Sequence, residues 1–338
     1  MLTIKDIALA AGVSPTTVSN VLHHHYKRVS PKTVEHIRQV IASMGYVPSM
    51  TARSLAGNVS RIIGVVSTLD PLGSGGFYMD PFHGELLSGI EKKLREHGYF
   101  LMIRTVENAQ ELHALLGSWN IDGLIMTGLF PQEIYDELHR QDTPVLLIDN
   151  LIHDEAMLHV RLEDKEGGYL ATRHLLENGH ERILFCCPSM EEDSVVAQRY
   201  QGYCDAMTEF GRPVYSGDVY QSSFSIEAGI ALGEELAKRD DFTAIVATAD
   251  ILAAELCQGL TRGGKQVPED VSIVGFDDSS MARLNHPPLT TIHQDAAKRG
   301  EKAVEILLQA IEAGLYAQPC VFPVSLVQRS SVKNVKEI

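Results

Sequence analysis

The chain has 338 residues, 44% of them hydrophobic, which is long enough for two or three folded cores and excludes a fibrous or disordered protein. No stretch approaches eighteen uncharged apolar residues, and no basic segment followed by an apolar run opens the chain, so we expect no membrane association and a cytoplasmic location. The five cysteines form no spaced framework, and Cys186 and Cys187 are adjacent, so reduced core residues are expected.

The net charge of -15 would by itself argue against a nucleic-acid partner, because DNA repels acidic surfaces. The charge is unevenly distributed, however. Residues 1–61 contain seven Lys or Arg residues and two Asp or Glu residues, a charge of about +5, which leaves about -20 for the rest of the chain. A basic N-terminal region on an acidic remainder can approach a DNA duplex with that region alone.

The first two predicted elements are short helices. Thr3 stands three residues before an acidic residue, close to a capping box, and apolar residues follow at helical spacing over residues 4–11. Gly12 can adopt a positive φ, and Ser14 and Pro15 supply the N-cap and first position of a second helix. Two short helices joined by such a turn are typical of a helix-turn-helix, whose second helix enters the major groove of DNA. The positions that face away from the apolar side of that helix are Pro15, Thr16, Thr17 and Asn20.

A third helix and a short fourth stretch follow. Ser30 and Pro31 repeat the N-cap signal, an apolar stripe runs to residue 44, and Gly45 ends the helix, so three helices form one small core. Residues 50–56 have another apolar side and precede Gly57. Seven residues are too few for a stable isolated helix.

These residues resemble the N-terminal region of the LacI/GalR family of bacterial regulators. The motifs are Thr3-Ile-Lys-Asp-Ile-Ala-x-x-Ala-Gly-Val-Ser-x-x-Thr-Val-Ser19, Val29-Ser30, Gly45-Tyr-x-Pro48 and Ala52-Arg-Ser-Leu-x-Gly57. The resemblance implies that the fourth stretch is a hinge helix which folds on operator DNA, with Leu55 of each subunit wedged into the minor groove. It also implies base contacts from Thr16 and Asn20. The full set of candidate DNA-binding residues is Thr3, Ser14, Pro15, Thr16, Thr17, Asn20, Ser30, Ala52, Arg53 and Leu55.

The segment His23-His24-His25-Tyr26-Lys27-Arg28 departs from the family pattern, because it is about one residue longer than the usual connection. A metal site is one interpretation, since imidazoles are good ligands. A solvated loop with Lys27 or Arg28 near a phosphate is favoured, because adjacent histidines in a loop project in different directions. We therefore expect no metal and no cofactor.

After residue 61, short apolar runs alternate with amphipathic helical stretches, which is the rhythm of βαβ units and parallel sheets. Helices are predicted over 81–97 and 167–178, each followed by a glycine. The predicted strands are 62–66, 101–103, 124–126, 145–148, 183–186, 244–247 and 273–276. The fold class is thus an all-α helix-turn-helix head joined by a hinge helix to an α/β body of two doubly wound parallel-sheet lobes, with ligand between the strand C-termini.

The resemblance extends over the body and implies a fold similar to type 1 periplasmic binding proteins. Motifs that carry it include Pro81-Phe-His-x-Glu85, Asp122-Gly-Leu-Ile125, Arg199-x-x-Gly202 and Pro268-Glu-Asp-Val-Ser-Ile-Val-Gly-Phe-Asp-Asp278. Three domains are expected: a helix-turn-helix over 1–48, a hinge over 49–60, and an effector-binding and dimerisation domain over 61–338. By the same resemblance, one lobe takes about 61–160 and 292–320, and the other takes about 161–291 and 321–338.

The resemblance places the effector between the lobes, where an arginine and carboxylates would hydrogen-bond the hydroxyls of a sugar. The candidate effector residues are Asp70, Phe77, Phe82, Asp149, Arg199, Asp250 and Asp277. Three of these residues have simpler interpretations, in which Arg199 pairs with Asp277 and Asp250 only caps the following helix. Where relatives often have Asn before that Asp, this chain has Ala249.

Two further features near the expected cleft allow alternative interpretations. The glycine-rich segment 72–79 is interpreted as a flexible lip with Phe77 or Tyr78 stacking on a sugar face, because no Gly-Lys-Ser follows to complete a phosphate-binding loop. The single Trp119 is more typical of a core residue than of a ligand contact.

The predicted function is a transcriptional repressor that binds a near-palindromic operator as a homodimer and responds to a sugar-like effector. The alternatives are a regulator that needs a purine or sugar phosphate as corepressor and, more remotely, a solute-binding transport component. Enzymatic activity is not expected, because no nucleophile with a base, no metal-ligand cluster and no cofactor fingerprint stands out. No leucine heptad follows residue 329, which favours a dimer over a tetramer.

Overall fold

The computed structural model describes residues 2–22, 25–46, 59–67, 80–128, 130–152, 157–188, 190–192, 194–222, 225–314 and 318–336. The chain forms two compact units, Met1–Arg61 and Ile62–Ile338. The predicted hinge and the glycine-rich lip lie almost entirely outside the described residues.

The N-terminal unit packs helices α1 (Ile4–Ala11), α2 (Pro15–Leu22) and α3 (Pro31–Met44) around one small core, with the short helix η1 (Tyr26–Arg28) before α3. The caps predicted from the sequence are confirmed. Thr3 closes a capping box on α1, Gly12 ends that helix with φ 64°, and Ser30 Oγ accepts the N–H of Thr33. Tyr46 completes the core from beyond α3. Local sequence signals thus set each boundary, and apolar residues from all three helices then fix how they pack.

The larger unit contains two six-stranded sheets. The N-lobe sheet has the order β11-β5-β4-β3-β1-β2, and the C-lobe sheet has the order β12-β10-β9-β8-β6-β7. All neighbouring strands pair in parallel apart from β10 and β12. The strands are β1 (Ile62–Ser67), β2 (Phe100–Thr105), β3 (Gly123–Thr127), β4 (Val145–Ile148), β5 (Leu158–Leu162), β6 (Ile183–Cys187), β7 (Val219–Gln221), β8 (Ala244–Ala247), β9 (Ser272–Asp277), β10 (Thr290–His293), β11 (Cys320–Phe322) and β12 (Ser325–Val327).

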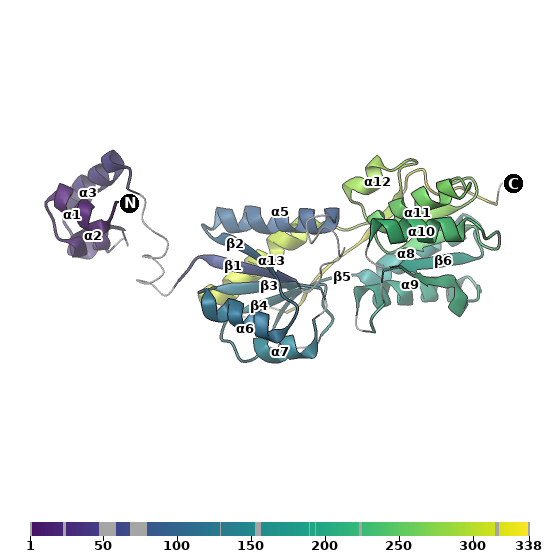
Figure 1. The fold of residues 1–338 in the computed structure, drawn as a ribbon, viewed down its shortest axis with the longest axis horizontal. Coiled ribbons are helices and arrows are strands. Elements are labelled where there is room, and N and C mark those ends of the chain that lie inside the picture. The colour runs from purple at the N-terminus through teal and green to yellow at the C-terminus, as the bar shows by residue number, and fades with distance from the viewer. Residues whose placement is uncertain are drawn as a thin grey trace. The chain divides into compact units, whose positions relative to one another are not determined.

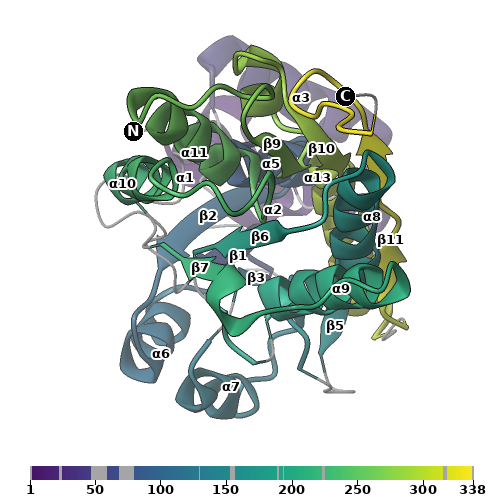
Figure 2. The ribbon, with the colours of Figure 1, turned by 90° about the vertical axis from the view of Figure 1, so that its right-hand side faces the viewer.

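Helices cover both faces of each sheet, so each lobe has three layers and a core on either side of its strands. In the N-lobe, α5 and α13 cover one face, and α6 and α7 cover the other (Figure 1). In the C-lobe, α8 and α9 lie on one side of β6, and α10 and α11 lie on the other (Figure 2). The helices are α5 (Pro81–Glu96), α6 (Ala109–Ser118), α7 (Gln132–Leu138), α8 (Asp164–Glu177), α9 (Val195–Glu209), η2 (Ser216–Asp218), α10 (Ile226–Leu236), α11 (Asp250–Arg262), α12 (Ser280–Leu284) and α13 (Ala296–Ala313).

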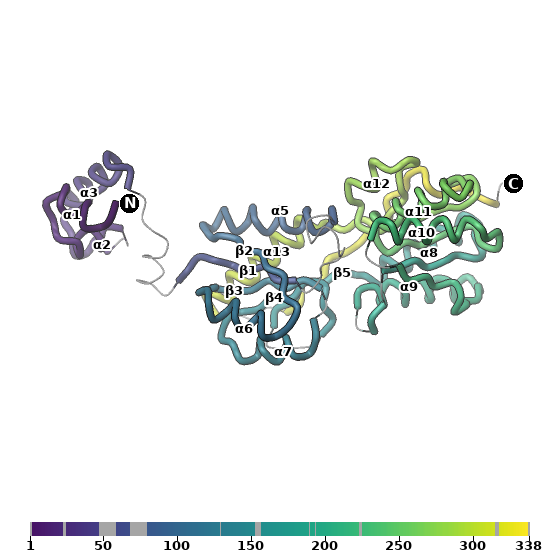
Figure 3. The backbone as a smooth tube through the Cα atoms, viewed as in Figure 1, coloured from purple at the N-terminus to yellow at the C-terminus, as the bar shows by residue number. Residues whose placement is uncertain are grey.

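The described chain passes between the two sheets three times: after β5, after β10 and after β11 (Figure 3). Each passage starts at the carboxyl end of a strand, so both lobes present their strand ends toward the crossings. This is where doubly wound sheets bind ligands. The predicted fold class is confirmed, with two parallel-sheet lobes after a helical head.

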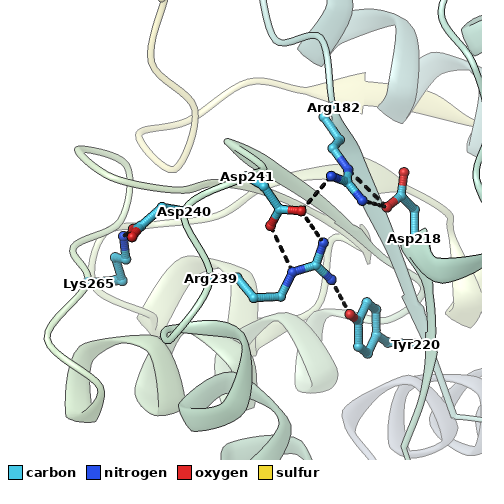
Figure 4. A network of polar contacts seen from close by, with 7 residues as sticks. All are labelled: Arg182, Asp218, Tyr220, Arg239, Asp240, Asp241 and Lys265. Atoms are coloured by element: carbon cyan, nitrogen blue, oxygen red, sulfur yellow. Dashed lines mark hydrogen bonds and ion pairs between the residues drawn. The ribbon is translucent and has the colours of Figure 1, made fainter.

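A network of charged residues ties the outer strand β7 to the rest of the C-lobe (Figure 4). Arg182 contacts both Asp218, at 2.8 Å, and Asp241, at 2.5 Å. Arg239 forms a two-pronged pair with Asp241 and donates to the hydroxyl of Tyr220 on β7. Asp218 is fully buried, and the pairing of its Oδ1 with Arg182 offsets part of the cost of burying that charge, while its Oδ2 has no hydrogen-bond partner.

Most of the predicted strands are confirmed within a residue or two, but β5, β7 and β10 to β12 were not predicted. β7, β11 and β12 have only three residues each, too few for a periodic signal. Helix α8 begins at Asp164, three residues before the predicted start. Cys186 and Cys187 are buried and free, as expected. No helix among the described residues is long and apolar enough to cross a membrane.

Candidate DNA-binding and effector-binding sites

Helix α2 presents an exposed N-terminal surface. Pro15 and Thr16 are exposed, and Thr17 and Asn20 are half-buried on the same helix. Ser14 caps this helix, since its Oγ accepts the Thr17 N–H at 3.1 Å and bonds the Thr17 hydroxyl at 2.8 Å. The structure therefore leaves Thr16 as the exposed hydroxyl of this helix start, while the hydroxyls of Ser14 and Thr17 are already engaged with each other.

The remaining predicted DNA-binding residues fall into two groups. Thr3 and Ser30 are exposed N-caps whose hydroxyls bond side chains in the first turn of α1 and α3. Ala52, Arg53 and Leu55 lie outside the described residues. A contact that sequence reasoning missed joins Arg38 of α3 to the Tyr26 hydroxyl at 2.9 Å, with the guanidinium also over the ring. It joins η1 to α3.

A cavity of about 320 Å³ opens between the carboxyl ends of the two sheets. This volume is at the lower end of the range for small-molecule sites. Residues from both lobes line it, with Phe82, Thr127 and Asp149 from the N-lobe and Arg199, Thr248 and Asp277 from the C-lobe. Of the seven predicted effector residues, the structure thus brings together four: Phe82, Asp149, Arg199 and Asp277.

On the N-lobe side, the lining is built from the ends of β4 and α5. Asp149 directly follows β4, has φ 58° and pairs with Arg299 of α13. Asp80 caps α5 by accepting the Phe82 N–H at 3.0 Å, and its other carboxylate oxygen bonds His83 at 2.8 Å. Sequence reasoning missed Asp80 and His83 as lining residues, although Asp80 before Pro81 is a clear N-cap signal.

On the C-lobe side, Asp277 ends β9 with φ 113°, a conformation that L-residues rarely adopt. Gln294, which follows β10, donates from Nε2 to Asp277 Oδ1 at 2.6 Å. Burial raises the pKa of Asp277 well above its usual value, and the nearby Arg199 opposes that rise. Strained backbone at two cavity carboxylates, Asp149 and Asp277, is typical of functional sites.

Arg199 enters the cavity from α9, where it is almost fully buried. It bonds Asp164 of α8 at 2.8 Å and the Thr248 carbonyl at 2.6 Å, and its guanidinium stacks on Phe276 with 3.5 Å to the ring centre. The interpretation that Arg199 pairs with Asp277 is therefore wrong, because its carboxylate partner is Asp164. Burial raises the pKa of Asp164 to about 6, and Arg199 opposes that rise.

Asp250 does not line the cavity. Its carboxylate accepts the Ser279 N–H at 2.8 Å and the Thr291 hydroxyl at 2.6 Å, so it joins α11 to the segment after β9 and to β10. Burial raises its pKa to about 6, and these hydrogen bonds oppose the rise. Nor does Asp250 cap α11, whose N-cap is Ala249 without a side-chain bond. The structure thus replaces both interpretations of Asp250 with an internal tie, while Ala249 lines the cavity.

Three further predictions concern the rim. Asp70 and Phe77, with the glycine-rich lip, lie outside the described residues. Trp119 follows α6, is 52% exposed and does not line the cavity, so its assignment to the core is wrong. Among the described residues, no three His, Cys, Asp or Glu side chains gather as metal ligands. His23 and His24 fall outside that search.

Sequence reasoning also missed Gln294 and Glu191, which line the cavity, and Arg299, which pairs with Asp149 beside it. Gln294 follows a strand that the sequence did not predict, so nothing marked it as a strand end. Arg299 is a charged residue on an amphipathic helix, where a solvated position is the usual expectation.

A helix-turn-helix unit and a two-lobed body with a cavity at its strand ends together define a ligand-responsive DNA-binding regulator. Residues 3–49 match the family described as bacterial regulatory proteins, lacI family, and residues 172–332 match a periplasmic binding protein-like domain. The chain is 33% identical to the HTH-type transcriptional repressor PurR of Photobacterium profundum, over 99% of this chain and 100% of that protein. The chain therefore belongs to the lacI family, and it is a transcriptional repressor controlled by an effector.

Two solved structures are similar over most of the chain. The lac repressor dimer bound to operator and the anti-inducer ONPF is 26% identical, with a TM-score of 0.83 and 98% of this chain and 99% of that chain covered. A LacI family transcriptional regulator from Enterococcus faecium with bound ribose is 28% identical, with a TM-score of 0.72 and 81% of this chain and 99% of that chain covered.

Proposed function

We propose that this repressor acts as a homodimer on a near-palindromic operator and that its effector is a neutral, hydroxyl-rich small molecule such as a sugar. The basic N-terminal unit reads the operator through the exposed start of α2, with Thr16 and Asn20 at base edges. The acidic body stays away from the duplex, and effector binding between the lobes alters the repressor's affinity for DNA.

The observation that carries the sugar assignment is the charge of the cavity. Asp80, Asp149, Glu191 and Asp277 line it, the lining arginine, Arg199, is already paired with Asp164, and Arg299 offsets the charge of Asp149 alone. Carboxylates accept hydrogen bonds from hydroxyl groups, and they repel phosphates. A neutral polyol therefore fits better than a sugar phosphate. The related regulator from Enterococcus faecium with bound ribose supports the same class of ligand.

A purine corepressor is the second candidate, because several relatives that match the whole chain are repressors named PurR. A purine has N–H donors for the same carboxylates, but it also needs an aromatic surface for stacking. Among the described lining residues, the aromatic rings are those of Phe82 and His83. They pack edge to face against each other with centroids 5.0 Å apart.

A thermal-shift screen of sugars, sugar phosphates and purine bases tests the effector class on the full chain. A ligand at about 100 times its Kd stabilises the folded state by about 2.7 kcal/mol, which is a melting shift of several degrees. We expect neutral sugars to give that shift and Asp277→Asn to lower their affinity at least tenfold. A shift with purine bases alone would establish the purine alternative, and a dominant shift with sugar phosphates would contradict the charge argument.

Fluorescence anisotropy with a near-palindromic duplex selected from random DNA tests the operator surface. Asn20→Ala should weaken binding about 10- to 100-fold, because one base-edge contact contributes about 1–3 kcal/mol. The matched control is Gln39→Ala on α3, an exposed amide whose side chain bonds Glu35 within the same helix. Equal losses for the two variants would remove α2 from its proposed role.

A further inference from the structure

Arg299 is the largest fully buried side chain among the described residues, and no predicted site includes it. It lies near the start of α13, on the N-lobe face that α13 shares with α5. One terminal nitrogen pairs with Asp149, and the other donates to the side-chain oxygen of Gln294. Its third nitrogen, Nε, is buried with no hydrogen-bond partner.

These contacts continue into the other lobe. Gln294 uses its oxygen for Arg299 and its Nε2 for Asp277 Oδ1, at 2.6 Å. Side chains therefore form an unbroken bridge from Asp149 through Arg299 and Gln294 to Asp277. Its two ends are cavity-lining carboxylates, one at the end of an N-lobe strand and one at the end of a C-lobe strand.

The helix that carries Arg299 is held close to α5 on both sides of it. A Cβ built on Gly89 of α5 would lie 2.0 Å from the Ala297 carbonyl oxygen, and one on Gly300 would lie 2.4 Å from the Leu86 carbonyl oxygen. Helix backbones come this close only where both positions lack side chains. The Phe82 ring at the start of α5 lies 5.9 Å from the guanidinium. Arg299 thus has little freedom to move without α5.

Stability alone gives a weak reason to keep a charge at this position. Burying an ion pair costs desolvation, and well-packed apolar side chains are often as stable or more so. A buried Nε without a partner adds to that cost. What the arginine supplies, and an apolar residue cannot, is a flat fork of donors that holds two acceptors at once in a fixed geometry.

We propose that Arg299 is a positioning residue that couples the two effector carboxylates. A ligand that binds Asp277 of the C-lobe then changes the position of Asp149 and of α5 in the N-lobe. This consequence for effector sensing rests on the proposed function, whereas the bridge itself does not. The coupling runs through the crossing between β10 and α13, which is one of the three connections between the lobes.

A double-mutant cycle, measured on the full chain without any ligand, tests the bridge. The fluorescence of the single tryptophan, Trp119, reports unfolding of the N-lobe. Asp149→Ala and Asp277→Ala, which remove the accepting oxygens, are measured alone and together, first in the natural background and then with Arg299→Met. In the natural background the melting shift of the double variant should be about 2 °C or more smaller than the sum of the single shifts, because cutting one end of the bridge already releases the other. With Arg299→Met the shifts should add.

Arg299→Lys separates positioning from charge. A lysine keeps a cation beside Asp149, but it lacks the flat fork needed to hold Gln294 at the same time. It should restore most of the melting temperature lost in Arg299→Met without restoring the coupling. If Arg299→Met does not fold, Gln294→Leu interrupts the bridge at its next link, and the same loss of coupling is expected.

Two outcomes would overturn the proposal. One is that the coupling between Asp149 and Asp277 persists in Arg299→Met or in Gln294→Leu, and the other is that the natural chain shows no coupling. These outcomes do not depend on any ligand, so a failed sugar screen and a failed cycle are distinguishable results.

Discussion

The two lobes each bury an arginine beside the cavity, but they use these arginines in different ways. Arg199 of the C-lobe bonds Asp164 and the Thr248 carbonyl, both in its own lobe. Arg299 of the N-lobe bonds Asp149 and then Gln294, whose amide contacts Asp277 of the other lobe. One arginine closes a local ion pair, and the other links strand ends of both sheets.

The difference shows that burial alone does not reveal what a charged side chain does. Asp164 is 3% exposed and faces the interior between α8 and α9, so its partner serves to satisfy it. Asp149 is 13% exposed and lines the cavity, so part of its carboxylate remains available to a ligand. The buried pair Arg199–Asp164 is enclosed within one lobe, whereas the pair Arg299–Asp149 leaves one carboxylate at the cavity surface.

The largest expected effect comes from breaking the buried pair between Arg199 and Asp164. Asp164→Ala leaves Arg199 charged and buried without its carboxylate, which should cost about 3–5 kcal/mol in the free energy of unfolding measured with urea. Asp149→Ala should cost less, because Asp149 is 13% exposed and lines the cavity, whereas Asp164 is 3% exposed, so water from the cavity can enter the space that Asp149 leaves. Equal costs would show that the two arginines are not distinguished by exposure.

An exposed pair provides the control for this comparison. Arg173 and Glu177 lie four residues apart on α8 at 2.8 Å, and each is about half exposed. Glu177→Ala should change stability by less than about 0.5 kcal/mol, because solvent already screens such pairs. A larger change there would mean that the urea measurement reports something other than buried charge.

A second prediction concerns His180, which ties the end of the chain to the C-lobe. Its Nδ1 contacts the Thr243 hydroxyl at 2.9 Å, and its Nε2 contacts the Lys333 carbonyl at 3.2 Å. Burial lowers the pKa of His180 to about 4, from an ordinary value of 6.5. The unfolded chain therefore binds a proton first as the pH falls, so stability present above pH 6.5 is lost between pH 6.5 and about 4.

The variant His180→Gln isolates this contribution, because glutamine does not titrate and every other group is shared. Between pH 6.5 and 4 the natural chain should lose up to about 3 kcal/mol more than the variant, as followed by urea unfolding at each pH. Parallel pH profiles for the two proteins would show that His180 is not kept neutral by the fold.

Local signals in the sequence were sufficient for the elements that begin or end with a specific chemical group. Thr3, Gly12 and Ser30 mark helix ends because their side chains or backbone freedom act within one turn. Six-residue apolar strands such as β1 and β9 were equally visible. The short strands were not, because strands such as β11 and β12 are defined by the neighbour they pair with and not by their own composition.

The candidate site could be predicted only in part, for a related reason. Asp149 and Asp277 end strands that the sequence shows, so their place beside the cavity followed from the fold. Asp250 also follows a strand, but it turns inward to Ser279 and Thr291, which are distant in sequence. The bridge through Arg299 joins residues about 150 positions apart. Partners of this kind are set by tertiary packing, and no spacing along the chain reveals them.

The smallest expected effect tests whether both arginines depend on the same close approach of helices. A Cβ on Gly168 would lie 1.9 Å from the Arg199 carbonyl oxygen, just as one on Gly89 would lie 2.0 Å from that of Ala297. Gly168→Ala and Gly89→Ala must each push two helices apart, at a cost of about 1–3 kcal/mol by urea unfolding. Gly84→Ala on α5 meets no atom within 4 Å and should be neutral or slightly stabilising. If only one of these two variants loses stability, then only the arginine of that lobe depends on tight helix packing. The two lobes would then share the burial of an arginine but not the helix packing that holds it.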